Sequence, residues 1–333
     1  MKIAIPTGDY YPGCLADYLQ RAFIRLGIEN RVVTTWEFAN LIAKNKQEFD
    51  LYFCADSVTT PLNFTNDIFG TRSLRNVCYW FTNYRLPNSK SAAFATAKAF
   101  EERGGWVFHS QMHDLESAGA AGFTRCSWLP LAADTTIWRP RPLPKIYDLG
   151  FVGKINDAER YNIIKLLQLK YKERFGFLGS GTLWTNEAAA LINCSRLGFN
   201  VSSGYGQAYA YDINMRFFET LACGVPIITN YTPFYFSLVD LYNINTEPDD
   251  SYSSGLPFVK LYSSISAIVP TVDEALSDHN FLLSGTVARE WIVRNHTYVH
   301  RIKDALRILG RNGFLDGVDT TFLQSLFETN VGA

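Results

Sequence analysis

Residues 210–230, AYDINMRFFETLACGVPIITN, place a helix pattern directly before a strand pattern. Arg216, Glu219 and Cys223 follow the i, i+3, i+7 spacing of one helix face, and the apolar residues between them line the other face. Gly224 ends this predicted helix, and Pro226 leads straight into a β-branched run. A helix that leads into a buried strand is the repeating unit of a parallel α/β sheet.

The same alternation of strand and helix patterns runs along most of the chain. In the first half we expect strands at 2–6, 29–36, 50–56, 76–83, 106–110 and 126–132, and helices at 15–28, 37–49, 91–105 and 111–120. In the second half we expect strands at 148–154, 175–181, 197–203 and 225–230, helices at 158–171, 186–194 and 214–223, and one or two closing helices at 286–310. The fold class is therefore α/β, with two doubly wound sheets.

A proline-rich segment, WRPRPLPKIYD at 138–148, interrupts both patterns and predicts an interdomain linker. We expect a first Rossmann-like domain over 1–140, which would hold the acceptor, and a linker over 141–147. A second Rossmann-like domain over 148–300 would hold the donor, and 301–333 would form a helical extension. Ligands of such domains bind at the carboxyl ends of the strands, so we expect a central cleft where the two domains face each other.

Bulk composition narrows the function classes. The 333 residues carry a net charge of −1 and a pI near 6.5, which gives no general attraction to nucleic acid or to an anionic membrane. The amino-terminal residues lack a secretory signal pattern and no long apolar run occurs, so we expect a cytoplasmic protein without an integral membrane segment. The six scattered cysteines predict buried free thiols rather than disulfides or metal ligands.

Glycines follow several predicted strands of the second half, notably Gly153, Gly179 and Gly181. Glycine allows backbone amides to approach a phosphate closely, and a following helix amino terminus favours negative charge. A nucleotide diphosphate suits such loops. No G-x-G-x-x-G opens a helix after the first strand and no G-x-x-x-x-G-K-[ST] occurs, which disfavours dinucleotide oxidoreductases and P-loop proteins.

Blocks at 80–87, 107–111, 128–140, 148–154, 176–181, 216–229 and 296–301 resemble glycosyltransferases of the GT-B fold, above all the R-x-F-E-x-x-A-x-G-x-P block. Within that fold the chain is most similar to the spore-maturation-protein-B-like group, which belongs with family 1 and family 4 type transferases. The resemblance implies transfer of a hexose or pentose from a UDP- or GDP-sugar to an acceptor hydroxyl. It also implies that no metal or other cofactor is required.

The resemblance also implies roles for residues of the second domain. Glu219 would hydrogen-bond the donor ribose, Lys154 would neutralise the diphosphate, and Arg160 and Arg216 would be further phosphate contacts. Cations placed there would stabilise the charge that develops on the leaving nucleotide. Many retaining relatives carry a second Glu where this chain has Tyr211, so the stereochemistry of the reaction stays open.

An inverting reaction needs a base in the acceptor domain to deprotonate the incoming hydroxyl. The sequence offers His109 and Asp9 as candidates, each at the end of a predicted strand, with His113 and Asp56 as rivals. Relatives often carry an acid after W-F-T, where this chain has Asn83.

The acceptor class also stays open among a glycan, a protein, a small molecule and a modified DNA base of the kind that phage GT-B enzymes glucosylate. Two alternatives to transfer remain on the same scaffold. One is a sugar-nucleotide epimerase or phosphorylase, and the other is a non-catalytic nucleotide-sugar-binding protein.

Overall fold

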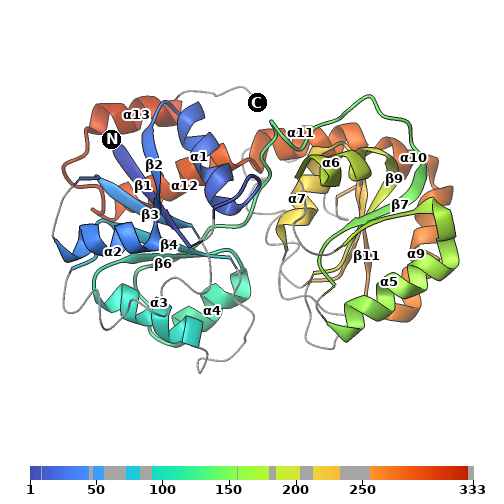
Figure 1. Cartoon of the computed structure of the whole chain (residues 1–333), viewed down its shortest axis with the longest axis horizontal. Helices are drawn as coiled ribbons and strands as arrows, with labels where there is room; N and C mark the ends of the chain where they lie inside the picture. Colours follow the sequence, from blue (N-terminus) through green and yellow to red (C-terminus); the bar gives the residue numbers. More distant parts are fainter. Residues whose placement is uncertain are drawn as a thin grey trace. The chain divides into compact units, whose positions relative to one another are not determined.

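The computed structural model describes residues 1–8, 10–44, 48–55, 73–82, 92–155, 157–179, 185–202, 213–232 and 256–328. The chain divides into two compact units, shown as ribbons in Figure 1. Unit 1 contains Met1–Pro130 and the segment from Tyr298 onward, and unit 2 contains Leu131–Thr297. The helices after Thr297 therefore group with the amino-terminal sheet.

Unit 1 is built on a six-stranded parallel sheet with the order β2-β1-β3-β4-β5-β6. Its strands are β1 (Lys2–Thr7), β2 (Glu29–Thr34), β3 (Leu51–Ala55), β4 (Val77–Phe81), β5 (Trp106–His109) and β6 (Cys126–Trp128). Its helices are α1 (Leu15–Arg25), α2 (Thr35–Ala43), α3 (Ala92–Glu102), α4 (Met112–Ala120), α12 (Tyr298–Arg311) and α13 (Thr320–Glu328).

The helices of unit 1 cover both faces of this sheet. One buried cluster joins α2, α3 and α4 to side chains of the sheet, including Tyr52 and Tyr79. On the other face α1 packs against α12, where the rings of Tyr18 and Tyr298 stack with centroids 5.1 Å apart. The carboxyl-terminal helix α12 is thus an integral layer of unit 1.

Unit 2 contains a five-stranded parallel sheet with the order β11-β10-β9-β7-β8. Its strands are β7 (Tyr147–Val152), β8 (Phe175–Leu178), β9 (Ser195–Asn200), β10 (Ile227–Asn230) and β11 (Val259–Tyr262). Its helices are α5 (Ala158–Tyr171), the short 3-10 helix η1 (Lys172–Arg174), α6 (Thr185–Asn193), α7 (Met215–Ala222), α9 (Ile265–Ser277), α10 (His279–Leu283) and α11 (Gly285–Asn295).

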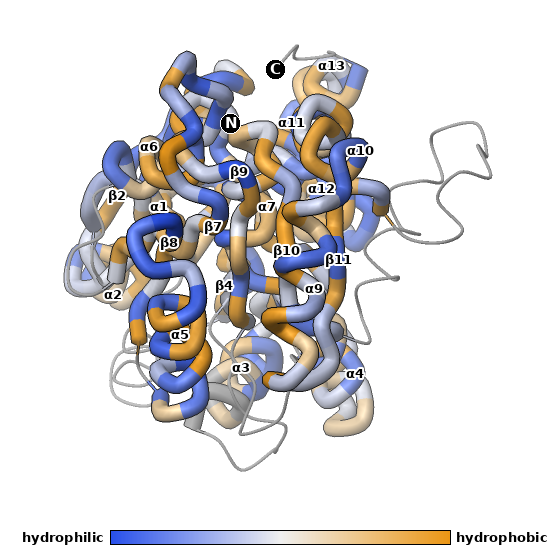
Figure 2. The backbone as a smooth tube through the Cα atoms, turned by 90° about the vertical axis from the view of Figure 1, so that its right-hand side faces the viewer, coloured by the Kyte–Doolittle hydropathy of each residue, from blue (hydrophilic) through white to orange (hydrophobic). Residues whose placement is uncertain are grey.

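The faces of the second sheet are also covered by helices. A buried cluster joins α5 and α9 to Phe151 and Phe199 of the sheet, while α6 and α7 pack on the opposite face (Figure 1). Figure 2 shows both hydrophilic and hydrophobic stretches along α5, which buries Ile163, Ile164, Leu167 and Tyr171. Two doubly wound parallel α/β units, as the sequence predicts, are confirmed.

Both sheets share one strand order when each is counted from its own first strand, 2-1-3-4-5, and unit 1 adds a sixth strand at the edge. The connections reverse direction between the first and third strands, which is the topological switch point where doubly wound sheets bind ligands. In unit 1 this point lies between β1 and β3, and in unit 2 between β7 and β9.

Within residues 210–230, Met215–Ala222 form α7 and Ile227–Asn230 form β10. Asn214 caps α7, because its side-chain oxygen accepts the amide hydrogen of Phe217 at 3.3 Å. Gly224 follows the helix with φ +71°, a conformation that L side chains rarely adopt. Gly285, the first residue of α11, lies against the carbonyl of Gly224 so closely that a Cβ there would collide with it.

Some elements differ from the sequence prediction. The strand β11 and the helices α9 and α10 have no counterpart among the predicted elements. Pro270 lies inside α9, and a proline in a helical pattern usually predicts a break. The predicted strand at 29–36 ends at Thr34, because the Thr34 side chain caps α2 by accepting the amide hydrogen of Glu37.

All six cysteines are free, as predicted, and Cys14, Cys54, Cys78 and Cys223 are buried. In the described part of the chain, no helix combines the length and the apolarity that a membrane span requires.

Candidate functional site

The carboxyl edge of the second sheet gathers most of the predicted donor residues. Gly153 and Lys154 follow β7, and Gly179 follows the neighbouring strand β8, whose Leu178 pairs with Val152. Lys154 is exposed, and its ammonium group forms no ion pair within the described residues. A lysine beside the switch point thus has its positive charge available to a ligand.

The two described glycines at this edge lie over aromatic rings. A Cβ at Gly153 would lie 2.9 Å from Cζ of Phe151, and a Cβ at Gly179 would collide with the ring of Phe177. The two rings stack with centroids 6.0 Å apart. Glycine is therefore required here by packing, and the bare backbone that results is also open to close approach by a ligand. Gly181 lies outside the described residues.

Arg160 joins the two loops that flank the switch point. It lies in the first turn of α5 and is buried. Its guanidinium donates from Nη1 to the carbonyl oxygen of Lys154 at 2.9 Å and from Nη2 to the carbonyl oxygen of Val201 at 2.8 Å. One planar side chain thereby holds the loop after β7 and the loop after β9 at a fixed separation.

The helix α7 is attached to the same point. Asn214 donates from Nδ2 to the carbonyl oxygen of Val201 at 3.4 Å, the same acceptor that Arg160 uses. Its side-chain oxygen meanwhile caps α7, so one residue fixes the start of the helix relative to β9.

Glu219 and Arg216 lie together on α7. Nη1 of Arg216 is 2.7 Å from Oε2 of Glu219, and the Glu219 side chain is only 2% exposed. The guanidinium of Arg216 also lies over the ring of Trp138, 4.8 Å from its centroid. The buried carboxylate of Glu219 is thus paired with an adjacent cation.

Cys223 lies one turn after Glu219 on the same helix. Burial, followed by the negative charge of Glu219, raises the pKa of its thiol to about 12. The thiol is therefore protonated near neutral pH, which removes its nucleophilic character.

A buried polar network that the sequence analysis does not single out lies at the ends of β9 and β10. Asn200 donates from Nδ2 to Thr229 Oγ1 at 3.0 Å, and the Ser202 amide donates to Asn230 Oδ1 at 2.9 Å. Two asparagines that end adjacent buried strands were the signal available in the sequence. These bonds order the backbone at the switch point from the side opposite β7.

His109 ends β5, as predicted, but its ring lies in the core of unit 1. The ring stacks on Phe81 at a centroid distance of 6.0 Å and meets the edge of Phe123 at 6.1 Å. Neither ring nitrogen has a hydrogen-bond partner within the described residues. Burial lowers the pKa of His109 to about 4, so the ring is neutral at ordinary pH. This environment favours a packing role over the predicted catalytic one.

Among the remaining residues that the sequence singles out, Asp9, Asp56, Asn83 and Tyr211 lie outside the described residues. Among the described residues no group of three or more His, Cys, Asp or Glu side chains is arranged to hold a metal ion. Metal-independent chemistry stays a prediction.

A family model described as glycosyl transferase-like matches residues 151–307, which include all of the described donor residues. No curated protein sequence matches the chain.

Solved structures match over nearly the whole chain. A sucrose-phosphate synthase from Thermosynechococcus elongatus superposes with a TM-score of 0.60 and 11% identity, covering 93% of this chain and 99% of that one. An alpha-glucosyltransferase in complex with UDP-glucose and DNA containing an abasic site gives 0.59 and 11%, covering 93% and 99%. AviGT4, a glycosyltransferase involved in avilamycin A biosynthesis, gives 0.56 and 12%, covering 95% and 98%.

At these identities the superpositions establish the fold, and the family model matches most of unit 2 and the first residues of α12. The chain thus has the GT-B fold of glycosyltransferases, and its residues 151–307 match the glycosyl transferase-like family.

Proposed function

We propose that the chain is a glycosyltransferase that moves a sugar from a UDP- or GDP-sugar to an acceptor hydroxyl without a bound metal. The observation that supports it best is the grouping at the switch point of unit 2. An exposed lysine, Lys154, follows β7, and the Asn214–Val201 bond attaches the helix that carries Glu219 to the end of β9.

In the proposed reaction the bond between the anomeric carbon and the diphosphate oxygen breaks, and a bond to the acceptor oxygen forms. The acceptor gives up its proton, and the nucleotide leaves with the bonding electron pair. Lys154 would stabilise the charge that develops on the diphosphate. Carboxylate oxygens accept hydrogen bonds, so Glu219 would hold the ribose hydroxyls.

The two arginines would act in different ways. Arg216, at 2.7 Å from Glu219, would hold that carboxylate in place. Arg160 donates to the carbonyls of Lys154 and Val201, which supports a role in ordering the donor loops. We therefore propose Lys154 as the main diphosphate contact and Arg160 as a positioning residue.

The environment of His109 bears on which residue of unit 1 would deprotonate the acceptor. The buried, neutral ring of His109 lies among phenylalanines and is a weak base. Asp9, two residues after the end of β1 at Thr7 in the sequence, stays a candidate, as do Asp56 and His113.

Calorimetric titration of UDP, GDP and UDP-glucose into the purified chain tests the proposal. We expect one nucleotide to bind, and Lys154→Ala to weaken its affinity by about tenfold, because a charged contact is worth roughly 1.5–3 kcal/mol. Lys170→Ala is the matched control, since Lys170 lies on α5 and pairs with Asp273. Equal affinities for the two variants would remove Lys154 from the site.

A further inference from the structure

A cavity of about 930 Å³ lies in unit 1 at the amino edge of its sheet, the edge opposite the switch point. Three of the residues that line it, Asp50, Asn76 and Arg125, directly precede β3, β4 and β6 respectively. The loop between α12 and α13, residues 312–318, forms another wall. The volume is within the range of small-molecule sites. Nothing in the proposed transfer reaction uses this cavity.

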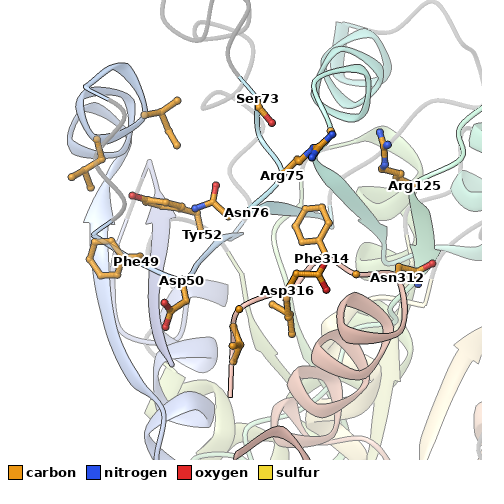
Figure 3. A pocket seen from close by; sticks show the side chains of 17 residues that line it. Phe49, Asp50, Tyr52, Ser73, Arg75, Asn76, Arg125, Asn312, Phe314 and Asp316 are labelled. Carbon is orange, nitrogen blue, oxygen red and sulfur yellow. The ribbon is translucent and has the colours of Figure 1, made fainter. Parts of the chain in front are cut away.

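Two arginines lie on one side of this cavity, Arg75 before β4 and Arg125 before β6. Both are exposed, and neither forms an ion pair within the described residues. Figure 3 shows their guanidinium groups projecting to the same rim of the pocket. Two positive groups on one side of a cavity, neither of them in an ion pair with the described residues, favour the binding of an anion beside them.

The segment that lies between the two arginines carries no side chains at the residues just before β5. β5 lies between β4 and β6 in the sheet, so the residues at the amino end of β5 lie between the segments that carry the two arginines. Gly104 and Gly105 directly precede β5. Gly104 has φ +92°, and a Cβ on it would lie 3.1 Å from Cγ of Arg75. Any other residue at 104 would be strained and would press on Arg75, so glycine preserves the gap.

The rest of the lining is mainly polar. Asn312 and Asp316 are exposed on the α12–α13 loop, and Asn76 is half-buried. These amide and carboxylate groups can bind hydroxyls. Phe49 and Tyr52 are buried and packed edge-on against each other at 5.6 Å, which leaves no open slot for stacking a base. The half-buried ring of Phe314 offers a small apolar surface.

We propose that this cavity is a second binding site of the chain, for a small anionic saccharide, meaning a sugar that carries a phosphate or a carboxylate. Arg75 and Arg125 would bind the anion, since guanidinium groups match the geometry of both anions. Asn312, Asp316 and Asn76 would bind the hydroxyls, and Phe314 would lie under an apolar face of the sugar ring. The site is separate from the proposed donor site, which lies in unit 2.

Calorimetric titration of the full chain with glucose 6-phosphate, glucuronate, glucose and inorganic phosphate tests this proposal. We expect glucose 6-phosphate or glucuronate to bind, inorganic phosphate to bind more weakly, and glucose to give no signal. The double variant Arg75→Gln, Arg125→Gln should bind the anionic sugar at least about tenfold more weakly. Arg294→Gln is the charge-matched control, because Arg294 is 69% exposed on α11 and is not among the residues that line the cavity.

Nucleotide binding separates this proposal from the proposed function. The double variant should bind the donor nucleotide as the wild type does, and Lys154→Ala should bind the anionic sugar as the wild type does. Absence of binding by both anionic sugars would overturn the proposal, as would unchanged affinity in the double variant or a loss in Lys154→Ala. Phosphate that binds as tightly as glucose 6-phosphate would overturn the assignment to a saccharide.

Discussion

Arg160 shows how a residue of the expected chemical type serves the site indirectly. A fork-shaped guanidinium can donate to Lys154 and Val201 together, whereas an ammonium cannot span both carbonyls. Arg160→Lys should therefore lower the free energy of unfolding by about 2 kcal/mol, measured by urea denaturation. Arg174→Lys is the control, because Arg174 is 62% exposed and pairs with Asp148 on the surface. If Arg160 served only as a direct phosphate contact, Arg160→Lys would leave the free energy of unfolding unchanged and would weaken only nucleotide binding.

The burial of His109 predicts how the free energy of unfolding depends on pH. Its folded pKa, about 4, is below the ordinary 6.5, so the unfolded chain binds the extra proton more readily. The free energy of unfolding should fall as the pH drops from 6.5 to 4. Below pH 4 this residue should lower it no further. His109→Phe removes the effect, worth about 3 kcal/mol at pH 4. In urea denaturation from pH 7 to 4, the free energy of unfolding of the variant should rise relative to that of the wild type. If the two free energies depended on pH in the same way, the burial of the ring would be contradicted.

The same histidine shows what a sequence leaves open at the residue scale. The pattern WVFHS predicts that His109 ends a strand, and β5 does end there. All four residues of β5 are buried, so alternation along the strand could not show which way the ring points. That direction depends on Phe81 and Phe123, which come from other elements.

At the scale of elements, the contact between α7 and α11 depends on Gly285. Because its hydrogen lies against the carbonyl of Gly224, Gly285→Ala should push the two helices apart and destabilise the fold by about 2 kcal/mol. Gly310→Ala is the matched control, since Gly310 lies inside α12 with no atom within 4 Å of a new Cβ. That change should stabilise by about 0.5–1 kcal/mol. Thermal unfolding of both variants checks the pair, and equal shifts would contradict the packing.

The elements that could be predicted from the sequence are those whose pattern lies within a single segment of the chain. The alternation that predicts β7, α5 and β8 lies within each segment, and those elements occur as expected. The helical pattern at 298–310 was equally clear, but its burial on α1 of the first sheet rests on a contact between Tyr18 and Tyr298, 280 positions apart in the sequence. Likewise, the Arg160 bond to Val201 joins residues 41 positions apart, which no local pattern reports.

At the scale of the whole molecule, charge bears on the acceptor. With a net charge of −1, the chain lacks the cationic excess from which non-specific DNA binding draws its affinity. We expect no binding to a double-stranded oligonucleotide at physiological salt, although the similar alpha-glucosyltransferase was solved with DNA. Fluorescence polarisation at increasing salt measures this. Tight binding with a steep salt dependence would instead favour a DNA acceptor.

We propose that unit 2 activates a nucleotide sugar through Glu219 and Lys154. The most direct measurement is the release of nucleoside diphosphate from UDP- and GDP-sugars, compared between the wild type, Glu219→Gln and Glu290→Gln. Glu290 is 57% exposed on α11 and provides a control that removes the same charge. The account predicts release by the wild type and by Glu290→Gln, and at least about a tenfold loss in Glu219→Gln. Equal release by all three proteins would contradict it.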